Sequence, residues 1–537
     1  MKKIWKKLFC FATALLIGTG GIACMAPSEN YDGVLLISVA NVGNGYQWCV
    51  EIAEAFTEKT GIETEVKPTA VNTYIDTTLP SGPNNNPVDI YMGNASYYTM
   101  LNRGVNAIKG YDYARPMLDI TEVFERDAEG YTDENGAPVS IKIKDLLDPD
   151  KYEDSIFDKD GKNYFIPYIS NLVGLIYNKG KFEEYGLKVP RTTDELIELC
   201  EYVRDNDKIE EYPIVYCGNN GYWRWTYNHW WVQYDGLESF RNFFTGKYNG
   251  SYEEGWRNYA SRGRYAAMEV FTELTKYENG FCDPQSSTYT FTQGQLHFLE
   301  GNGLMIPTGD WIEQEMIGNF APGEVELGVM HVPLVSSIVD RLPSFKGSDE
   351  QKEETLRDVI DYVDGKTDVK PAGVEDEDID EVRAARNLIG KDSSDMFIPV
   401  YSDMAEEAKD FIQFYFSKQA QELLLEYSGS TTAPLNSDYP LDYFDAFDTL
   451  SEFQQTKMEL FNEHTRTFAE SDNHAIVYAG GAKTFYSQST PIIDRVVGLN
   501  PAQTASRLTG IEIYEETLEY YSNRTTWQNM LKNAGLA

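Results

Sequence analysis

The stretch from Gly161 to Lys179, GKNYFIPYISNLVGLIYNK, restricts the fold of this chain more than any other part of it. A tight turn at Asp160-Gly161 leads into a β-rich segment that reaches Pro167. Proline has no N–H for a sheet ladder, so we expect ordinary strand pairing to end there and residues 168–171 to form an unpaired connection. A second apolar strand is expected over 172–177. Two strands joined by a stiff extended piece suit a crossing between two lobes. The alternative is one strand with a proline bulge inside a single domain.

The beginning of the chain predicts a parallel sheet. Gly33 to Ala40 is a continuous apolar run, typical of a buried strand. A helix that Gly61 ends and a strand over 62–66 follow, which makes a βαβ unit. In such sheets ligands bind outside the carboxyl ends of the strands. The residues expected to face a cleft there are Asn44, Tyr46 and, after a strand at 88–92, Asn94.

Charge and the first residues indicate where the protein works. Acidic residues outnumber basic ones 85 to 46, for a net charge of −39. Lys2, Lys3, Lys6 and Lys7 precede the apolar run 8–17, a pattern typical of a secretory signal. Removal of that segment leaves a net charge of about −43. Such a protein would be repelled by nucleic acid, so we expect no nucleic-acid partner.

Several motifs occur together in a fixed order. After AFTEKTGIETEV and VDIYMGN come GxxYxxP…GLxYNK, YGLKVPRTTDEL, FLEGNGLMIPTGDW and AEEAKDFIQFYFS. This ordered set resembles the extracellular solute-binding proteins of carbohydrate ABC transporters, the maltose-binding-protein-like family. The similarity spans nearly all of the mature chain. The resemblance implies an α/β fold of two lobes, each a mostly parallel sheet flanked by helices, with a ligand cleft between them.

The resemblance also divides the chain. We expect a lipoprotein signal peptide at 1–23, lobe one at 31–168 and 334–428, and lobe two at 169–333 and 429–537. The second and third crossings would then lie at 325–333 and at 429–434. Residues 344–391 depart from the family pattern and read as a charged insertion with two amphipathic helices. This division places the insertion in lobe one.

Residues 21–24, Gly-Ile-Ala-Cys, resemble a bacterial lipobox, in which the cysteine is lipidated and becomes the new N-terminus. The usual leucine three places before the cysteine is Gly21 here. We expect Cys24 to carry acyl chains that anchor the protein at the extracellular face of the bacterial cell membrane. A simple secretory signal is the alternative.

The segment 221–236, GYWRWTYNHWWVQYDG, contains four of the nine tryptophans. Read as a helix it has one aromatic stripe, so Trp230, Trp231 and Tyr234 are expected in the core. The residues that follow the loop before this helix are assigned to the cleft: Tyr222, Trp223 and Trp225.

Two other places complete the candidate site. At the first crossing Tyr168 and Asn171 offer polar groups to a ligand. In the GDW motif the family places an aromatic residue at the cleft, here Trp311, beside Asp310, which can cap a helix and accept sugar hydroxyls. The alternative at this motif is a plain helix cap with a buried tryptophan.

The family resemblance implies that the protein binds its ligand without a chemical reaction. The histidines have no metal-ligand spacing, and neither a Walker A motif nor a GxSxG elbow is present. The resemblance implies a monomeric receptor that binds a carbohydrate and serves an ABC permease, without a cofactor. A secreted polysaccharide-active enzyme, which needs only two carboxylates, is the alternative, as is the same fold with a peptide or polyamine ligand. Neither acidic turn carries a full calcium loop, although structural calcium remains an option. Cys49 and Cys200 are expected in the core.

Overall fold

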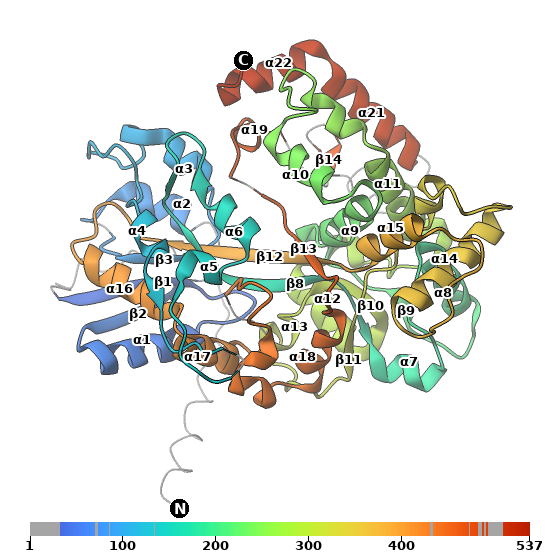
Figure 1. The fold of residues 1–537 in the computed structure, drawn as a ribbon, viewed down its shortest axis with the longest axis horizontal. Helices are drawn as coiled ribbons and strands as arrows, with labels where there is room; N and C mark the ends of the chain where they lie inside the picture. Colours follow the sequence, from blue (N-terminus) through green and yellow to red (C-terminus); the bar gives the residue numbers. More distant parts are fainter. Residues whose placement is uncertain are drawn as a thin grey trace, which may run out of the picture.

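The computed structural model describes residues 33–69, 74–84, 86–133, 135–429, 433–471, 473–481, 486–487, 490–491 and 509–537. The expected signal peptide and Cys24 lie outside these residues. Figure 1 shows two lobes, each with helices around strands, joined by two long strands that run through both. The expected two-lobed α/β fold is confirmed.

Lobe one forms around the βαβ unit at its start. β1 (Val34–Ala40) pairs in parallel with β2 (Glu63–Thr69) and β3 (Ile90–Gly93). Between them α1 (Gln47–Thr60) ends at Gly61, which is in the left-handed conformation with φ 78°. The remaining elements of this part are α2 (Tyr74–Thr78), α3 (Tyr97–Arg103), α4 (Thr121–Phe124), β4 (Asp127–Ala128), β5 (Ile141–Lys142), α5 (Ile143–Leu146), α6 (Pro149–Asp154), β6 (Ile156–Phe157) and β7 (Lys162–Asn163).

The first crossing is one continuous strand, β8 (Ile166–Asn178), so the prediction of an unpaired connection at 168–171 is wrong. β8 pairs antiparallel with β12 (Leu388–Phe397) along both lobes. The register shifts at Ser394/Asp395, which leaves Tyr168 as an extra residue next to Pro167. A β-bulge is where a sheet tolerates a proline, and this explains why the strand continues.

Lobe two adds strands to the other half of β8. β10 (Gly303–Gly309) and β11 (Leu327–Met330) pair antiparallel with it, and β9 (Tyr212–Ile214) pairs in parallel with β10. The helices of this part are α7 (Lys179–Tyr185), α8 (Thr193–Asp205), α9 (Trp223–Asp235), α10 (Leu237–Thr245), α11 (Arg262–Thr275), α12 (Phe291–His297) and α13 (Ile312–Glu315).

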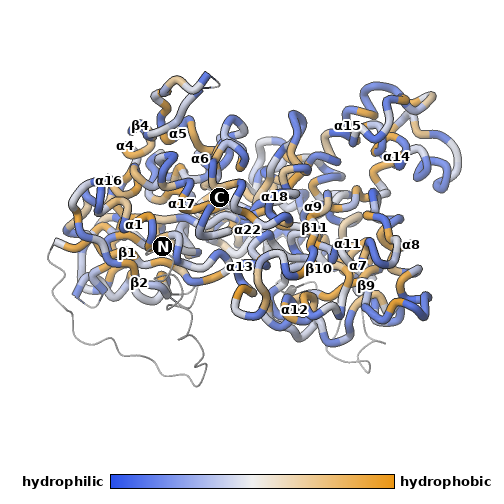
Figure 2. The backbone as a smooth tube through the Cα atoms, turned by 90° about the horizontal axis from the view of Figure 1, so that it is seen from below, coloured by the Kyte–Doolittle hydropathy of each residue, from blue (hydrophilic) through white to orange (hydrophobic). Residues whose placement is uncertain are grey.

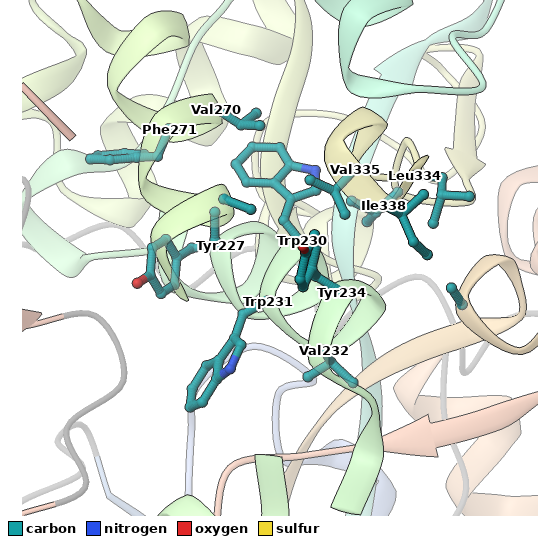
Figure 3. Packing of buried hydrophobic residues seen from close by; sticks show 14 of the residues in the cluster. Tyr227, Trp230, Trp231, Val232, Tyr234, Val270, Phe271, Leu334, Val335 and Ile338 are labelled. Carbon is teal, nitrogen blue, oxygen red and sulfur yellow. The ribbon is translucent and has the colours of Figure 1, made fainter. Parts of the chain in front are cut away.

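The aromatic stripe of α9 lies in the core of lobe two, as predicted. Trp230 and Trp231 have no exposed surface, and Tyr234 is 6% exposed. Figure 3 shows Trp230 between Val270 of α11 and the segment that contains Val335. Cys49 and Cys200 are also fully buried, as predicted.

The insertion belongs to lobe two, so its expected place in lobe one is wrong. The chain does not cross at 325–333, because β11 pairs with the lobe-two half of β8. The two predicted amphipathic helices are present as α14 (Asp349–Val363) and α15 (Asp376–Arg386). Their apolar stripes join the hydrophobic cluster of α9 and α11, at the outer end of lobe two (Figure 2). The second crossing is β12 itself.

The third crossing also lies later than expected. After α16 (Ala405–Tyr415) and α17 (Lys418–Ser428), the chain at Pro434 still accepts a hydrogen bond from Asp148 N in lobe one. Phe444 and Leu450 are in the core of lobe one, whereas Phe453 is in a lobe-two cluster. The short turns that follow Pro434 therefore stay on lobe one because their apolar residues pack there.

The C-terminal part covers lobe two and reaches back to lobe one. After α18 (Glu452–Thr456), β13 (Arg466–Phe468) pairs with the start of β12. α19 (Ala475–Tyr478) contacts α3, where the Tyr478 and Tyr98 rings are 6.0 Å apart. The remaining elements are β14 (Tyr486–Ser487), β15 (Thr490–Pro491), α21 (Gly510–Ser522) and α22 (Arg524–Ala534). The helices α21 and α22 lie at the top of the molecule in Figure 1.

Candidate functional site between the lobes

The two spanning strands present two faces where the lobes meet. Neighbouring side chains of a strand point to opposite faces, and directly paired residues share one. Asn171 is paired with Asp392, and Leu172 is paired with Lys391. The first pair therefore belongs to one face and the second pair to the other.

Three aromatic side chains of lobe two gather on the face of Asn171; we call Tyr222, Trp225 and Trp311 the aromatic face. Tyr222 is the N-cap of α9, Trp225 lies in its first turn, and Trp311 follows β10. The Tyr222 and Trp225 ring centroids are 4.5 Å apart, and the Trp225 and Trp311 centroids 5.2 Å apart. Trp225 and Trp311, which are 5% and 6% exposed, also pack on Val173 of β8.

Lobe one closes over the aromatic face through the loop between β1 and α1. Gly43 has φ 52°, and a Cβ there would lie 3.5 Å from Trp311 Cγ. Gly43 N donates to Glu315 Oε1 at 3.2 Å. The amides of Asn44 and Asn171 each donate to the other at 3.0 Å. Burial raises the pKa of the Glu315 carboxyl. The lobes are thus in direct contact here, and separating them would uncover Trp311.

Charged side chains border the aromatic face. The Arg224 guanidinium lies 4.6 Å from the Trp225 ring centroid and 4.0 Å from Asp392 Oδ1. Burial raises the pKa of the Asp392 carboxyl. Flat apolar rings beside amides and carboxylates match the C–H surfaces and hydroxyls of a sugar.

The structure brings five of the predicted site residues together: Asn44, Asn171, Tyr222, Trp225 and Trp311. It does not place the other predicted residues with them. Asp310 lines a cavity on the opposite face of the spanning strands. Asn94 is exposed after β3, and Tyr46 is half-buried at the start of α1.

Two predicted site residues lie inside lobe cores instead. Tyr168 is 3% exposed, and its ring stacks on Trp48 of α1 at a centroid distance of 5.6 Å. Trp223 is 1% exposed and packs against Tyr216 and Phe271. Trp223 belongs to the buried stripe of α9, whereas Trp225, two positions on, points to the other side of the helix.

Three residues at the aromatic face were missed from sequence: Arg224, Glu315 and Asp392. The alternation Trp-Arg-Trp at 223–225 was a signal, because an arginine between aromatic residues often stacks on one of them. Asp392 directly follows the charged insertion in sequence and was not assigned to the site.

The family assignment rests on most of the sequence. The sequence pattern of the bacterial extracellular solute-binding protein family matches residues 51–444. The chain belongs to this family. A 67-residue part of this solute-binding protein is 42% identical to the multiple sugar-binding protein of Streptococcus mutans, which is 12% of this chain and 14% of that protein.

Solved structures agree on the fold. A protein from work on xylan utilisation by the bacterium Caldanaerobius polysaccharolyticus matches with a TM-score of 0.57 and 14% identity, over 90% of this chain and 99% of the other. Maltose-bound MalE3 of T. maritima has a TM-score of 0.56 and 13% identity, over 91% and 99%. A chitin oligosaccharide binding protein has a TM-score of 0.56 and 15% identity, over 91% and 98%.

No helix in the described ranges is both long and apolar enough to cross a membrane. Nor does any group of three or more His, Cys, Asp or Glu side chains in that part of the chain have an arrangement suited to a metal ion.

Proposed function

We propose that this solute-binding protein captures a sugar or oligosaccharide between its lobes and delivers it to the permease of an ABC importer. The observation that supports this most is the aromatic face, where three rings of lobe two pack at Val173 of a spanning strand, and Asn171 of the same strand bonds to Asn44 of lobe one. The names of the similar proteins, which mention multiple sugars, maltose and chitin oligosaccharide, point the same way.

Capture would use the rings and the amides together. A sugar ring stacked on Trp225 or Trp311 buries apolar C–H surface, which contributes about 25 cal/mol per Å² removed from water. The Asn44 and Asn171 amides, now bonded to each other, would exchange that contact for sugar hydroxyls. Entry requires the lobes to separate, and the spanning strands β8 and β12 are the segments across which such a hinge motion would occur.

We propose further that the protein is a receptor without catalytic activity, because its family is one of binding proteins. A polysaccharide-active enzyme would need two carboxylates on either side of a scissile bond. A peptide or polyamine remains the alternative ligand for the same fold. In this proposal the protein is a monomer anchored through Cys24 on the extracellular side of the membrane. Bound calcium would be structural only.

A glycan panel tests this function. The melting temperature of the intact protein would be measured with neutral oligosaccharides, and reducing sugar release would be measured in the same samples. A ligand that binds only the folded state raises the melting temperature by mass action. We expect a rise with intact oligosaccharide and no product. New reducing ends would support the enzyme, and no shift with any glycan would favour a non-sugar ligand.

Replacing Trp225 tests whether the sugar binds at the aromatic face. Trp225→Ala should weaken binding of the stabilising glycan by about 1 to 3 kcal/mol, because it removes one stacking surface. Tyr202→Ala is the matched control, since Tyr202 is 54% exposed on α8, away from the aromatic face. Equal affinities for the two folded variants would contradict a sugar site at this face.

A further inference from the structure

A second space between the lobes lies on the opposite side of the spanning strands from the aromatic face. It encloses about 1220 Å³ and is lined by residues of both lobes. Ser170 and Leu172 of β8 and Lys391 of β12 border it. Lobe one contributes α6 and residues 433–442, and lobe two contributes α10 and residues 457–474. We call this space the inter-lobe cavity.

Two lysines in the lining have no ion-pair partner among the described residues. They are Lys151 of α6 and Lys391 of β12, and both are half-buried. Lys391 Nζ instead lies 5.2 Å from the centroid of the Phe461 ring. The positive charge of Lys151 contributes to the lowered pKa of Lys391, so the two ammonium groups are close enough to interact. By contrast, Lys457 and Arg241 in the same lining pair with Asp310 and Asp150.

Asp310 presents an unused acceptor beside these lysines. Its Oδ2 accepts from Lys457 Nζ at 2.7 Å. Its other oxygen, Oδ1, is buried and has no hydrogen-bond partner in the described part of the chain, and the whole residue is 1% exposed. A buried acceptor without a donor is costly, and a ligand hydroxyl would satisfy it. Among the described residues, the lining therefore combines two lysines that form no ion pair with one carboxylate oxygen that has no donor.

We propose that the inter-lobe cavity is a second binding site, for a hydroxylated carboxylate such as a sugar acid. The ligand carboxylate would lie between Lys151 and Lys391, and a ligand hydroxyl would donate to Asp310 Oδ1. Leu172 and the edge of Phe461 would contact its apolar surface. This site is separate from the sugar site proposed at the aromatic face, and it does not depend on that site being correct.

The other acidic residues of the lining either face water or already have partners. Asp154, for example, accepts from Ser471 Oγ at 3.2 Å and lies near the charge of Lys151. Asp438, Asp442 and Glu463 are exposed to water, where salt screens their charge. The Asp148 carboxylate is already engaged, since it accepts from Thr467 Oγ1 and from Asp150 N. The cavity is also large enough for this ligand, because its volume of about 1220 Å³ is above the range of about 300–1,000 Å³ that is usual for small-molecule sites.

Titration calorimetry of the intact protein with three probes tests the proposal. Glucuronate carries both the carboxylate and the hydroxyls, glucose lacks the carboxylate, and acetate lacks the hydroxyls. We expect glucuronate to bind more tightly than either at this site. Lys391→Met and Lys151→Met should each weaken glucuronate by about tenfold or more, since each removes a charge-assisted hydrogen bond. Lys109→Met, a change at an exposed lysine of lobe one outside the lining, should leave the affinity unchanged.

The glucuronate affinities of these variants show whether the acid binds in the inter-lobe cavity or at the aromatic face. Trp225→Ala should change glucuronate affinity by less than about twofold if the ligand is in the inter-lobe cavity. Loss of glucuronate binding in Trp225→Ala, with retention in both lysine variants, would overturn the proposal and place the acid at the aromatic face. No binding of glucuronate to the intact protein would also overturn it. Circular dichroism of each variant establishes that it is folded before titration.

Discussion

Lys391 has a half-buried ammonium group in the inter-lobe cavity. Burying this charge lowers the free energy of unfolding by an amount that depends on pH. Burial lowers the pKa of Lys391 to about 8, from about 10.4 in an unstructured chain. The charge of Asp310 works against that shift, and the charge of Lys457 adds to it. Between about pH 8 and 10.4 the unfolded state therefore binds more protons than the folded state, so the free energy of unfolding rises with pH in that window.

We expect Lys391→Met to be more stable than the parent protein at pH 7, because methionine keeps the contact with Phe461 without a buried charge. The difference should narrow as the pH rises from about 8 to 10, since the parent lysine loses its proton in the folded state. Urea unfolding of both proteins at pH 7, 8, 9 and 10 measures this. A difference in unfolding free energy that is the same at every pH would contradict the expected titration.

The ion pair between Lys457 and Asp310 is buried on both sides, with side chains 3% and 2% exposed. Lys457→Met leaves a carboxylate in the interior without its cation and should lower the free energy of unfolding by about 3 kcal/mol or more. Adding Asp310→Asn removes the orphaned charge, so the double variant should recover part of that loss. Urea unfolding of the parent protein and of the single and double variants measures these differences in the free energy of unfolding. If the double variant is the least stable, the pair does not behave as a buried salt bridge.

At the scale of elements, the charged insertion is part of the structure of lobe two. α14 has a wide acidic face, yet Leu356, Val359 and Ile360 have no exposed surface. Arg191, at the end of the loop before α8, pairs with Asp361 of α14, and Arg357 of α14 pairs with Glu198 of α8. Because α14 makes both apolar and charged contacts with lobe two, it is an integral part of that lobe. Its deletion would expose the apolar surface that it covers.

Ile360→Ala should therefore destabilise the protein by about 2 to 4 kcal/mol, which is the usual cost of removing a large buried side chain. Val369→Ala is the control within the same insertion, because Val369 is 74% exposed. Thermal or urea unfolding compares the two. Similar stabilities for both variants would mean that α14 does not pack on lobe two.

Elements whose pattern is local could be predicted, and elements whose pattern depends on distant residues could not. The βαβ start and the stripe of α9 follow from apolar spacing within one segment. β8 continues past Pro167 because it bulges at Tyr168 while it stays paired with Ser394 and Asp395 of β12, some two hundred residues away. β12 itself was missed because its middle, Lys391 to Asp395, is polar and reads as a loop. Those residues bridge the gap between the lobes, where neither face is buried in a core.

At the scale of the whole molecule, the same dependence on distant residues explains why only part of the candidate site could be predicted. The resemblance pointed to both Asp310 and Trp311, yet the two neighbours serve opposite faces of the junction. Which face a residue occupies depends on the register between β8 and β12, which no local pattern shows. The two spanning strands therefore determine both what lies at the aromatic face and what lies in the inter-lobe cavity. A change in the angle between the lobes would alter the two spaces together.

The attachment of the whole molecule to a membrane is the remaining prediction. Residues 24–33 could span at most roughly 30 Å when extended, so acyl chains on Cys24 would keep the lobes close to the lipid surface. A carbohydrate bound between the lobes would then be near the permease. We expect mass spectrometry of the native protein to find acyl groups on an N-terminal Cys24.

Cys24→Ser should release the protein into the medium, because the acyl chains that contribute about 0.8 kcal/mol per buried methylene would be absent. Its sugar affinity should match that of the parent protein, since Cys24 precedes the first strand and both lobes. Detergent phase partitioning compares the two proteins directly. An unmodified N-terminus at any other residue, or a Cys24→Ser variant that stays with the membrane, would contradict the lipid anchor and leave the simple secretory signal as the explanation of the first residues.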